Sequence, residues 1–202
     1  MYLVMAGLRV LVNEHEVASV SNDGLNLISL RVSGDVVGDE LAVVELTGGN
    51  YSGEGTTHLT WISGRELSED DVVEVLFLED IQSSHTGKTI EELFPDYEEN
   101  ELPSQSIDEI FSDLSIKPKQ REGHKFHLTL PDGEVRLLAT DQKDFSFGFS
   151  VMWKWIKPNE ASVWLTSNSL EGVRDRADGT THAKLRLHYG ESVQIRTATN
   201  KI

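Results

Sequence analysis

The feature that most constrains the fold of this chain is an internal duplication. The tetrapeptide Gly-Thr-Thr-His occurs at 55–58 and again, 124 positions later, at 179–182. Three further blocks correspond in the same order, at offsets between 118 and 120 residues. They pair 8–12 with 126–130, 40–47 with 160–166, and 71–75 with 191–195. Repetition of this kind indicates that one structural unit has been copied, so both halves should adopt related folds.

The repeated blocks have the alternating pattern of β-strands. Phe126, Leu128 and Leu130 alternate with more polar residues, and the turn sequence 131–133 (Pro-Asp-Gly) follows. Such alternation places one face of a strand in a core and the other in water. The other strands expected are at 25–33, 40–47, 57–62, 72–79, 144–156, 160–167, 181–187 and 192–198. The sequence therefore predicts a mainly β fold of two tandem, related antiparallel β-sandwich or small-barrel domains.

These patterns divide the chain into three parts. The first copy covers 1–82, a connector covers 83–121, and the second copy covers 122–202. The connector has helical spacing of apolar residues, Ile90, Leu93, Phe94 and Tyr97, and then Ile107, Ile110, Phe111 and Leu114. Each run begins with a capping box, Thr89 to Glu92 and Ser106 to Glu109. Because helices this short do not persist alone, we expect their apolar stripes to dock on a sandwich.

Charge separates the two copies. The chain has 202 residues with 34 acidic and 18 basic side chains, a net charge of −16. Residues 1–98 hold 19 acidic and 4 basic side chains, a net of −15, whereas residues 122–202 hold 10 and 11, a net of +1. This balance argues against a nucleic-acid partner, since phosphate binding needs clustered Lys and Arg. The excess of acids has two interpretations: it serves solubility or suits a salt-rich host, or it recruits a basic protein partner to the first half.

Several other classes of site are disfavoured by the composition. The absence of cysteine excludes disulfides and thiolate metal sites. No stretch approaches the ~18 apolar residues of a membrane span, and the N-terminus is a poor signal peptide, so we expect a cytoplasmic protein without a membrane partner. The sequence does not indicate an oligomeric state.

No cofactor or metal is expected. Gly87-Lys88-Thr89 opens a helix as in a phosphate-binding loop, but the glycine that the full motif needs is replaced by Gln82. Asp175 and Asp178 could hold Ca²⁺ in a loop, although the bidentate glutamate of the helix-loop-helix site is missing.

Candidate binding residues fall into three groups. Glu69, Asp70 and Asp71 form an acidic run typical of a solvated loop. Trp153 and Trp155 end an aromatic strand that is better suited to a core but could stack on a ligand at its end. His58 and His182 are the histidines of the repeated tetrapeptide, and neither has a second histidine at metal-ligand spacing. No residue is assigned a catalytic role.

These observations favour a non-enzymatic, acidic interaction protein. The specific hypothesis is an inhibitor or immunity-type protein whose first half masks a cationic protein. The alternative is a carbohydrate- or small-molecule-binding module, or an enzyme, that uses the cleft between the two copies, with His58 or His182 involved.

Overall fold

The computed structural model describes residues 5–53, 55–96 and 105–199, and these form two antiparallel six-stranded sheets. The first copy supplies β1 (Gly7–Val12), β2 (His15–Ser21), β3 (Leu27–Asp35), β4 (Ala42–Asn50), β5 (Thr57–Leu67) and β6 (Val72–Leu78). The second copy supplies β7 (His124–Thr129), β8 (Val135–Ala139), β9 (Asp144–Lys154), β10 (Ala161–Ser169), β11 (Thr180–Leu187) and β12 (Ser192–Thr199). The expected mainly β, antiparallel fold is confirmed, and its form is a sandwich.

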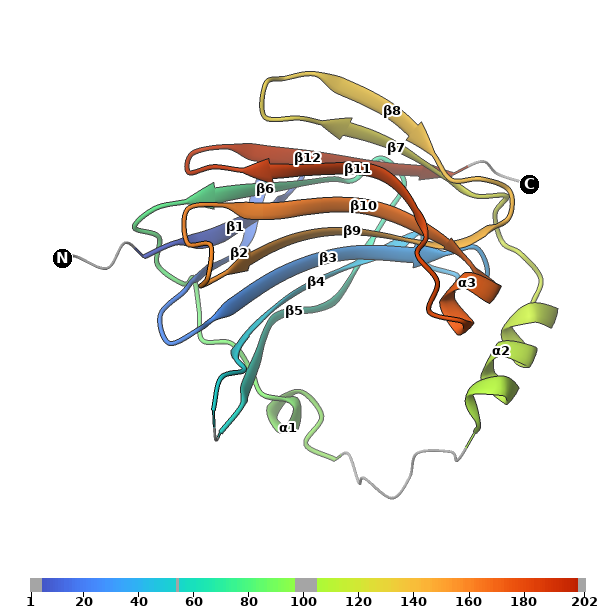
Figure 1. Cartoon of the computed structure of the whole chain (residues 1–202), viewed down its shortest axis with the longest axis horizontal. Coiled ribbons are helices and arrows are strands. Elements are labelled where there is room, and N and C mark those ends of the chain that lie inside the picture. The colour runs from blue at the N-terminus through green and yellow to red at the C-terminus, as the bar shows by residue number, and fades with distance from the viewer. Residues whose placement is uncertain (1–4, 54, 97–104, 200–202) are drawn as a thin grey trace.

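The two sheets pack face to face around one apolar core (Figure 1). Alternation along β9 shows how the sequence builds this core. Phe147, Phe149, Val151 and Trp153 are buried, whereas the residues between them are only half-buried on the outer face. On the facing sheet, Phe77 of β6 and other alternating apolar residues complete the cluster. Burial of one face of every central strand is what selects sheet-on-sheet packing.

Both copies contribute to both sheets. The first sheet has the order β2-β1-β6-β12-β7-β8, and the second has the order β11-β10-β9-β3-β4-β5. The copies meet along the antiparallel pairs β6–β12 and β3–β9. In the latter pair Arg31 lies opposite Ser150, which is 119 positions later and equivalent in the repeat. The copies spanning 1–82 and 122–202 thus lie side by side within one sandwich, rather than each forming a sandwich of its own.

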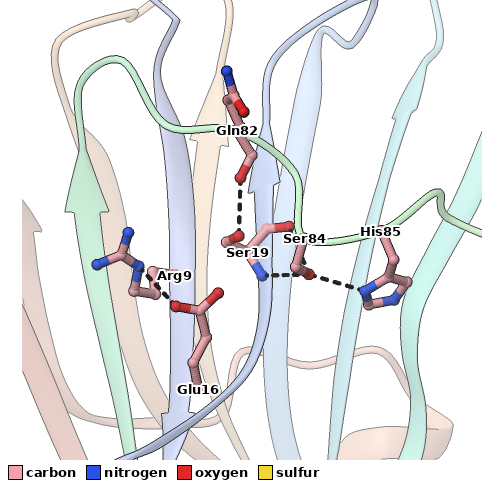
Figure 2. A network of polar contacts seen from close by, with 6 residues as sticks. All are labelled: Arg9, Glu16, Ser19, Gln82, Ser84 and His85. Carbon is pink, nitrogen blue, oxygen red and sulfur yellow. Dashed lines mark hydrogen bonds and ion pairs between the residues drawn. The ribbon is translucent and has the colours of Figure 1, made fainter.

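A segment after β6, residues 80–88, closes the edge of the sandwich in the first copy, and we call it the strap. It joins the edge strands of the two sheets. The Ser84 N–H donates to the Ser19 carbonyl of β2 at 2.9 Å, and Thr60 of β5 and Lys88 exchange backbone hydrogen bonds of 2.8 and 2.9 Å. Figure 2 shows the side-chain bonds that reinforce it: the Ser19 hydroxyl donates to the Gln82 carbonyl at 2.9 Å, and the Ser84 hydroxyl accepts from the Ser19 N–H at 3.1 Å.

The connector contains α1 (Ile90–Leu93) and α2 (Ile107–Ile116), and α3 (Leu170–Arg174) follows β10. Both expected capping boxes are present, with Thr89 and Ser106 as the caps. The expected docking of the apolar stripes is wrong, because neither α1 nor α2 has a buried residue. Both helices lie on the outer side of the second sheet (Figure 1), where α1 contacts β5 and α2 contacts α3. Tyr97 lies outside the described residues.

Candidate interaction surface

The acidic run Glu69–Asp71 forms the turn between β5 and β6, and its three carboxylates have different surroundings. Asp71 holds the turn together, since its carboxylate accepts from the Ser68 N–H at 2.7 Å and from the Asn13 amide at 2.6 Å. Asp70 is exposed and lies 3.5 Å from the guanidinium of Arg196 on β12. Glu69 is exposed beside it. Asp71 is therefore a structural residue, while Glu69 and Asp70 face solvent.

The two tryptophans of the aromatic strand have opposite environments. Trp153 is 1% exposed, and its indole N–H donates to the Pro158 carbonyl at 2.9 Å, so its ring belongs to the core. Trp155 lies just beyond the end of β9 and is 60% exposed, next to the equally exposed Ile156. Of these two tryptophans, Trp155 offers a ring face to a ligand, because the alternation that buries Trp153 ends with the strand.

The repeated histidines lie on opposite edges of the second sheet, His58 on β5 and His182 on β11, so they cannot form one site. His58 Nδ1 lies 2.6 Å from the Tyr51 hydroxyl, whose pKa is raised by partial burial. His182 Nε2 lies 2.7 Å from the hydroxyl of Ser167, which donates to the Asp144 carboxylate at 2.5 Å.

The Asp144–Ser167–His182 chain has the residue types of a catalytic triad but not its order. In nucleophilic catalysis the imidazole lies between the hydroxyl and the carboxylate, whereas here the hydroxyl is central. Ser167 is also fully buried, so no external substrate reaches its oxygen. The first copy has Leu25 and Gly48 at the positions that correspond to Asp144 and Ser167. The chain is therefore a structural link across β9, β10 and β11 that the first copy lacks.

A second buried polar group surrounds His124 at the start of β7, on the core-facing side of the strand. His124 is 2% exposed, and its ring lies against Phe147 with 4.6 Å between centroids. Burial, and then the positive charge of Arg121, lower the pKa of His124 to about 4. The buried guanidinium of Arg121 donates to the carbonyls of Asp35 and Asp39, which fastens the end of the connector to the loop after β3.

Each copy occupies one half of the sandwich, so the difference in charge between the copies becomes a difference in charge between two sides of the molecule. Residues 1–98 carry 19 acidic and 4 basic side chains, and their strands occupy one half of each sheet. Arg9 is paired with Glu16 at 3.2 Å. Many of the carboxylates are exposed, among them Glu45, Glu66, Glu79, Asp80, Glu91 and Glu92. The side that contains β2, β5 and α1 is therefore strongly acidic.

Apolar side chains of the connector lie exposed on helices that also carry acids, a feature that the expectation of docked helices missed. Their exposed fractions are 55% for Ile90, 52% for Phe94, 63% for Ile107, 42% for Ile110 and 79% for Ile116. Glu91 and Glu92 of α1, and Asp108 and Glu109 of α2, lie on the same helices. Exposed apolar residues rimmed by charge are typical of a protein-binding surface.

A hollow of about 250 Å³ lies where the copies meet at the β3–β9 seam. Its charged lining residues are Arg31, Asp35 and Glu40, and neither His58 nor His182 lines it. Over the part of the chain that the structure describes, no group of three His, Asp or Glu side chains is arranged to hold a metal. Within the same residues no helix has the length and apolarity to cross a membrane.

Comparison of the sequence with models of protein families and with curated proteins, and of the structure with solved structures, finds no match.

Proposed function

We propose that this protein is a non-enzymatic binding protein that holds a cationic protein partner against its acidic first copy. An inhibitor or immunity-type protein that masks a basic surface is the specific form of this function. The observation that carries the proposal is the gathering of β1 to β6 on one side of a shared sandwich, since these strands belong to residues 1–98, whose net charge is −15. A concentrated field of one sign accelerates encounter with a surface of the opposite sign and disfavours other partners.

The connector supports the same proposal with short-range contacts. Interfaces are stabilised chiefly by a few apolar or aromatic anchors that become buried, while charged rims direct the approach. Phe94, just beyond α1, is half-exposed close to the carboxylates of Glu91 and Glu92, and α1 itself contacts β5 of the acidic copy. Apolar anchors and acidic side chains thus occur together on the same side of the molecule.

The test is capture of partners from a lysate of the native host with the full chain as bait, followed by mass spectrometry. A parallel capture uses the triple variant Glu45→Gln, Glu66→Gln and Glu79→Gln, which removes three exposed carboxylates from the first copy. The matched control removes three exposed carboxylates from the second copy, Glu122→Gln, Glu171→Gln and Asp178→Asn.

A basic protein that is retained by the wild type and the control, and depleted at least about tenfold by the triple variant, supports the proposal. Equal retention by all three baits would show that the acidic side does not select the partner. Turnover of a small molecule by the purified chain would instead favour the enzymatic alternative.

A further inference from the structure

The two copies end differently at the outer edges of the first sheet. In the first copy the strap covers the edge strand β2, where it bonds backbone groups of Ser19 and Ser21 that point away from β1. The equivalent strand of the second copy is β8, and Leu137 and Ala139 occupy the corresponding positions. Within the described ranges β8 pairs with β7 alone, and no other segment bonds its outer side (Figure 1).

The register of β7 and β8 shows which backbone groups of β8 are free. The Thr140 N–H donates to the His124 carbonyl at 3.0 Å, and the ladder that follows has no bulge. Bonded and non-bonded pairs alternate along an antiparallel ladder. The N–H and carbonyl groups of Val135, Leu137 and Ala139 therefore point away from β7, toward the open side of the strand.

The side chains of these three residues lie on the outer face of the sheet. Leu138 is opposite the buried Phe126, so its neighbours in β8 face away from the core. Val135 is 55% exposed and Leu137 is 71% exposed. Free backbone groups beside exposed apolar side chains make this edge a ready acceptor for a further strand.

The edge is complementary to a second copy of itself. An antiparallel pair centred on Leu137 and its own equivalent places Val135 of each chain opposite Ala139 of the other. All three outward-facing residues then exchange both of their backbone hydrogen bonds across the pair. Their apolar side chains also meet in one cluster on the outer face, where cross-strand contacts stabilise a sheet.

The neighbouring symmetric registers fit less well. A pair centred on Arg136 would place two guanidinium groups directly opposite each other, which is destabilising. A pair centred on Leu138 would place Val135 opposite Asp141, whose N–H already bonds the carboxylate of Asp144 at 2.9 Å. The register centred on Leu137 avoids both conflicts.

The distribution of charge permits a second copy at this edge. Residues 122–202 have a net charge of +1, and Arg136 is paired with Glu134 of its own chain at 2.9 Å. In the sheet order β8 lies three positions from β6, the nearest strand of the acidic copy. At a strand spacing of about 4.8 Å, the β6 strands of two paired molecules would be about 34 Å apart. This distance is several times the screening length of about 8 Å at physiological ionic strength.

We propose that β8 binds β8 of a second copy of this chain, with Leu137 opposite its own equivalent at a two-fold axis. The first sheets of the two molecules become one continuous sheet, and their acidic sides face outward at its two ends. The seam within one chain uses the same mode, because the equivalent strands β6 and β12 pair antiparallel. The proposal is independent of the cationic partner, which is assigned to the other side of the molecule.

Sedimentation equilibrium of the full chain, between about 1 and 500 µM in 0.15 M salt, measures this association. Because β8 offers only five residues, we expect a reversible dimer with a Kd of about 1–100 µM. Leu137→Lys removes the central apolar contact and opposes two ammonium groups, so it should raise the Kd at least about tenfold. Ile116→Lys, at a position 79% exposed on α2, adds the same charge outside the paired strand and is the matched control. Its Kd should stay within about threefold of the wild type, since the added charge is screened.

Single-cysteine variants test the register, because the natural chain has no cysteine. In the proposed pair the Cα atoms of Leu137→Cys and its equivalent are about 5.5 Å apart, within the range of a disulfide. Those of Val135→Cys are about 14 Å apart, because each residue lies two positions from the centre. Mild oxidation should therefore cross-link the first variant as a dimer and leave the second as a monomer.

Three results would overturn the proposal: a chain that stays monomeric up to about 500 µM, a dimer as stable in folded Leu137→Lys as in the wild type, or equal cross-linking of the two cysteine variants. The cross-linking comparison introduces no charge into β8, so it decides the question if Leu137→Lys does not fold.

Discussion

Glu74 on β6 lies directly opposite Gln194 on β12, and the two are equivalent residues of the duplication, 120 positions apart. Arg31 and Ser150 have the same relationship in the other sheet. A residue that pairs with its own repeat equivalent must lie close to a two-fold axis. The axis therefore passes through both sheets, and the seam between the copies has the geometry of a symmetric dimer joined into one chain.

This seam predicts that neither copy is a folded monomer alone. A fragment of residues 122–202 would expose the inner edges of β9 and β12, and its core residues would lose their neighbours in β3 and β6. We expect the fragment to be unfolded or self-associated, and a mixture with residues 1–121 to restore the β-type circular dichroism spectrum. Size-exclusion chromatography of each fragment and of the mixture measures this.

A cooperative unfolding transition of monomeric 122–202 would contradict this prediction. Such a result would show that three strands per sheet suffice for a separate domain, as the division at residues 82 and 122 suggests.

The buried His124 predicts a loss of stability in mild acid. Its pKa is about 4 in the folded protein, against 6.5 for the unperturbed group. Above pH 6.5 both the folded and unfolded chains hold it neutral. As the pH falls from 6.5 to 4, the unfolded chain takes up a proton that the folded chain does not, which lowers the free energy of unfolding by about 3 kcal/mol.

Urea denaturation at a series of pH values measures this loss. The variant His124→Phe, which cannot be protonated and can still pack against Phe147, should remove most of the decline between pH 6.5 and 4. The exposed His15→Gln is the control and should keep it. An unchanged decline in His124→Phe would assign the acid sensitivity to other groups.

The hydrogen bonds that link Asp144, Ser167 and His182 predict a loss of stability on mutation that is larger than the loss at His58 of the first copy. Ser167→Ala removes the hydroxyl that bonds both Asp144 and His182, and leaves a buried carboxylate with one donor fewer. We expect this variant to lower the free energy of unfolding by about 1–3 kcal/mol. His58→Ala, which loses only an exposed contact with Tyr51, should cost less. Equal losses of unfolding free energy in Ser167→Ala and His58→Ala, measured by chemical denaturation, would show that the buried hydrogen bonds of Ser167 stabilise the fold no more than the exposed contact of His58.

The positions of individual strands and helix starts could be predicted from the sequence, whereas the pairing between strands could not. Alternation located Phe147 to Trp153 of β9, and the capping boxes at Thr89 and Ser106 marked both helix starts. The pairing of β3 with β9 and of β6 with β12 joins residues more than 110 positions apart. The same alternating pattern also satisfies a separate sandwich for each copy, so local spacing alone does not choose between them.

The candidate surface was only partly predictable for a related reason. The charge difference between the copies is a sum over the sequence, and it needs no structure. Helical spacing found the apolar residues of α1 and α2 but gave no information on whether they are covered. The link between Asp144 and Ser167 depends on register, since these residues are 23 positions apart on neighbouring strands. Exposure of Trp155 followed from the point at which β9 ends.

The exposed connector residues predict an effect on the lifetime of a complex. Phe94→Ser removes a half-exposed aromatic ring that would become buried against the partner. Loss of an interfacial anchor raises the dissociation rate, by about tenfold or more for a central residue, and leaves the association rate nearly unchanged. Val173→Ser on α3, which removes an apolar residue of similar exposure from the second copy, is the control. Equal dissociation rates for both variants, measured by biosensor with the captured partner, would exclude this end of α1 from the interface.

The exposed carboxylates predict the complementary effect, on the rate of association. If the acidic side recruits a basic protein by long-range attraction, the association rate should fall steeply with salt, because the screening length shrinks from about 30 Å at 0.01 M to about 10 Å at 0.1 M. Dissociation should change much less, as short-range contacts govern it. The double variant Glu69→Gln and Asp70→Asn should slow association at low salt without unfolding the protein, because Asp71, which holds the turn, is retained. Glu171→Gln with Asp178→Asn, on the neutral copy, is the matched control. A stopped-flow salt series in which the association rate is constant, or in which the two double variants behave alike, would leave the acidity of residues 1–98 without a role in recruitment.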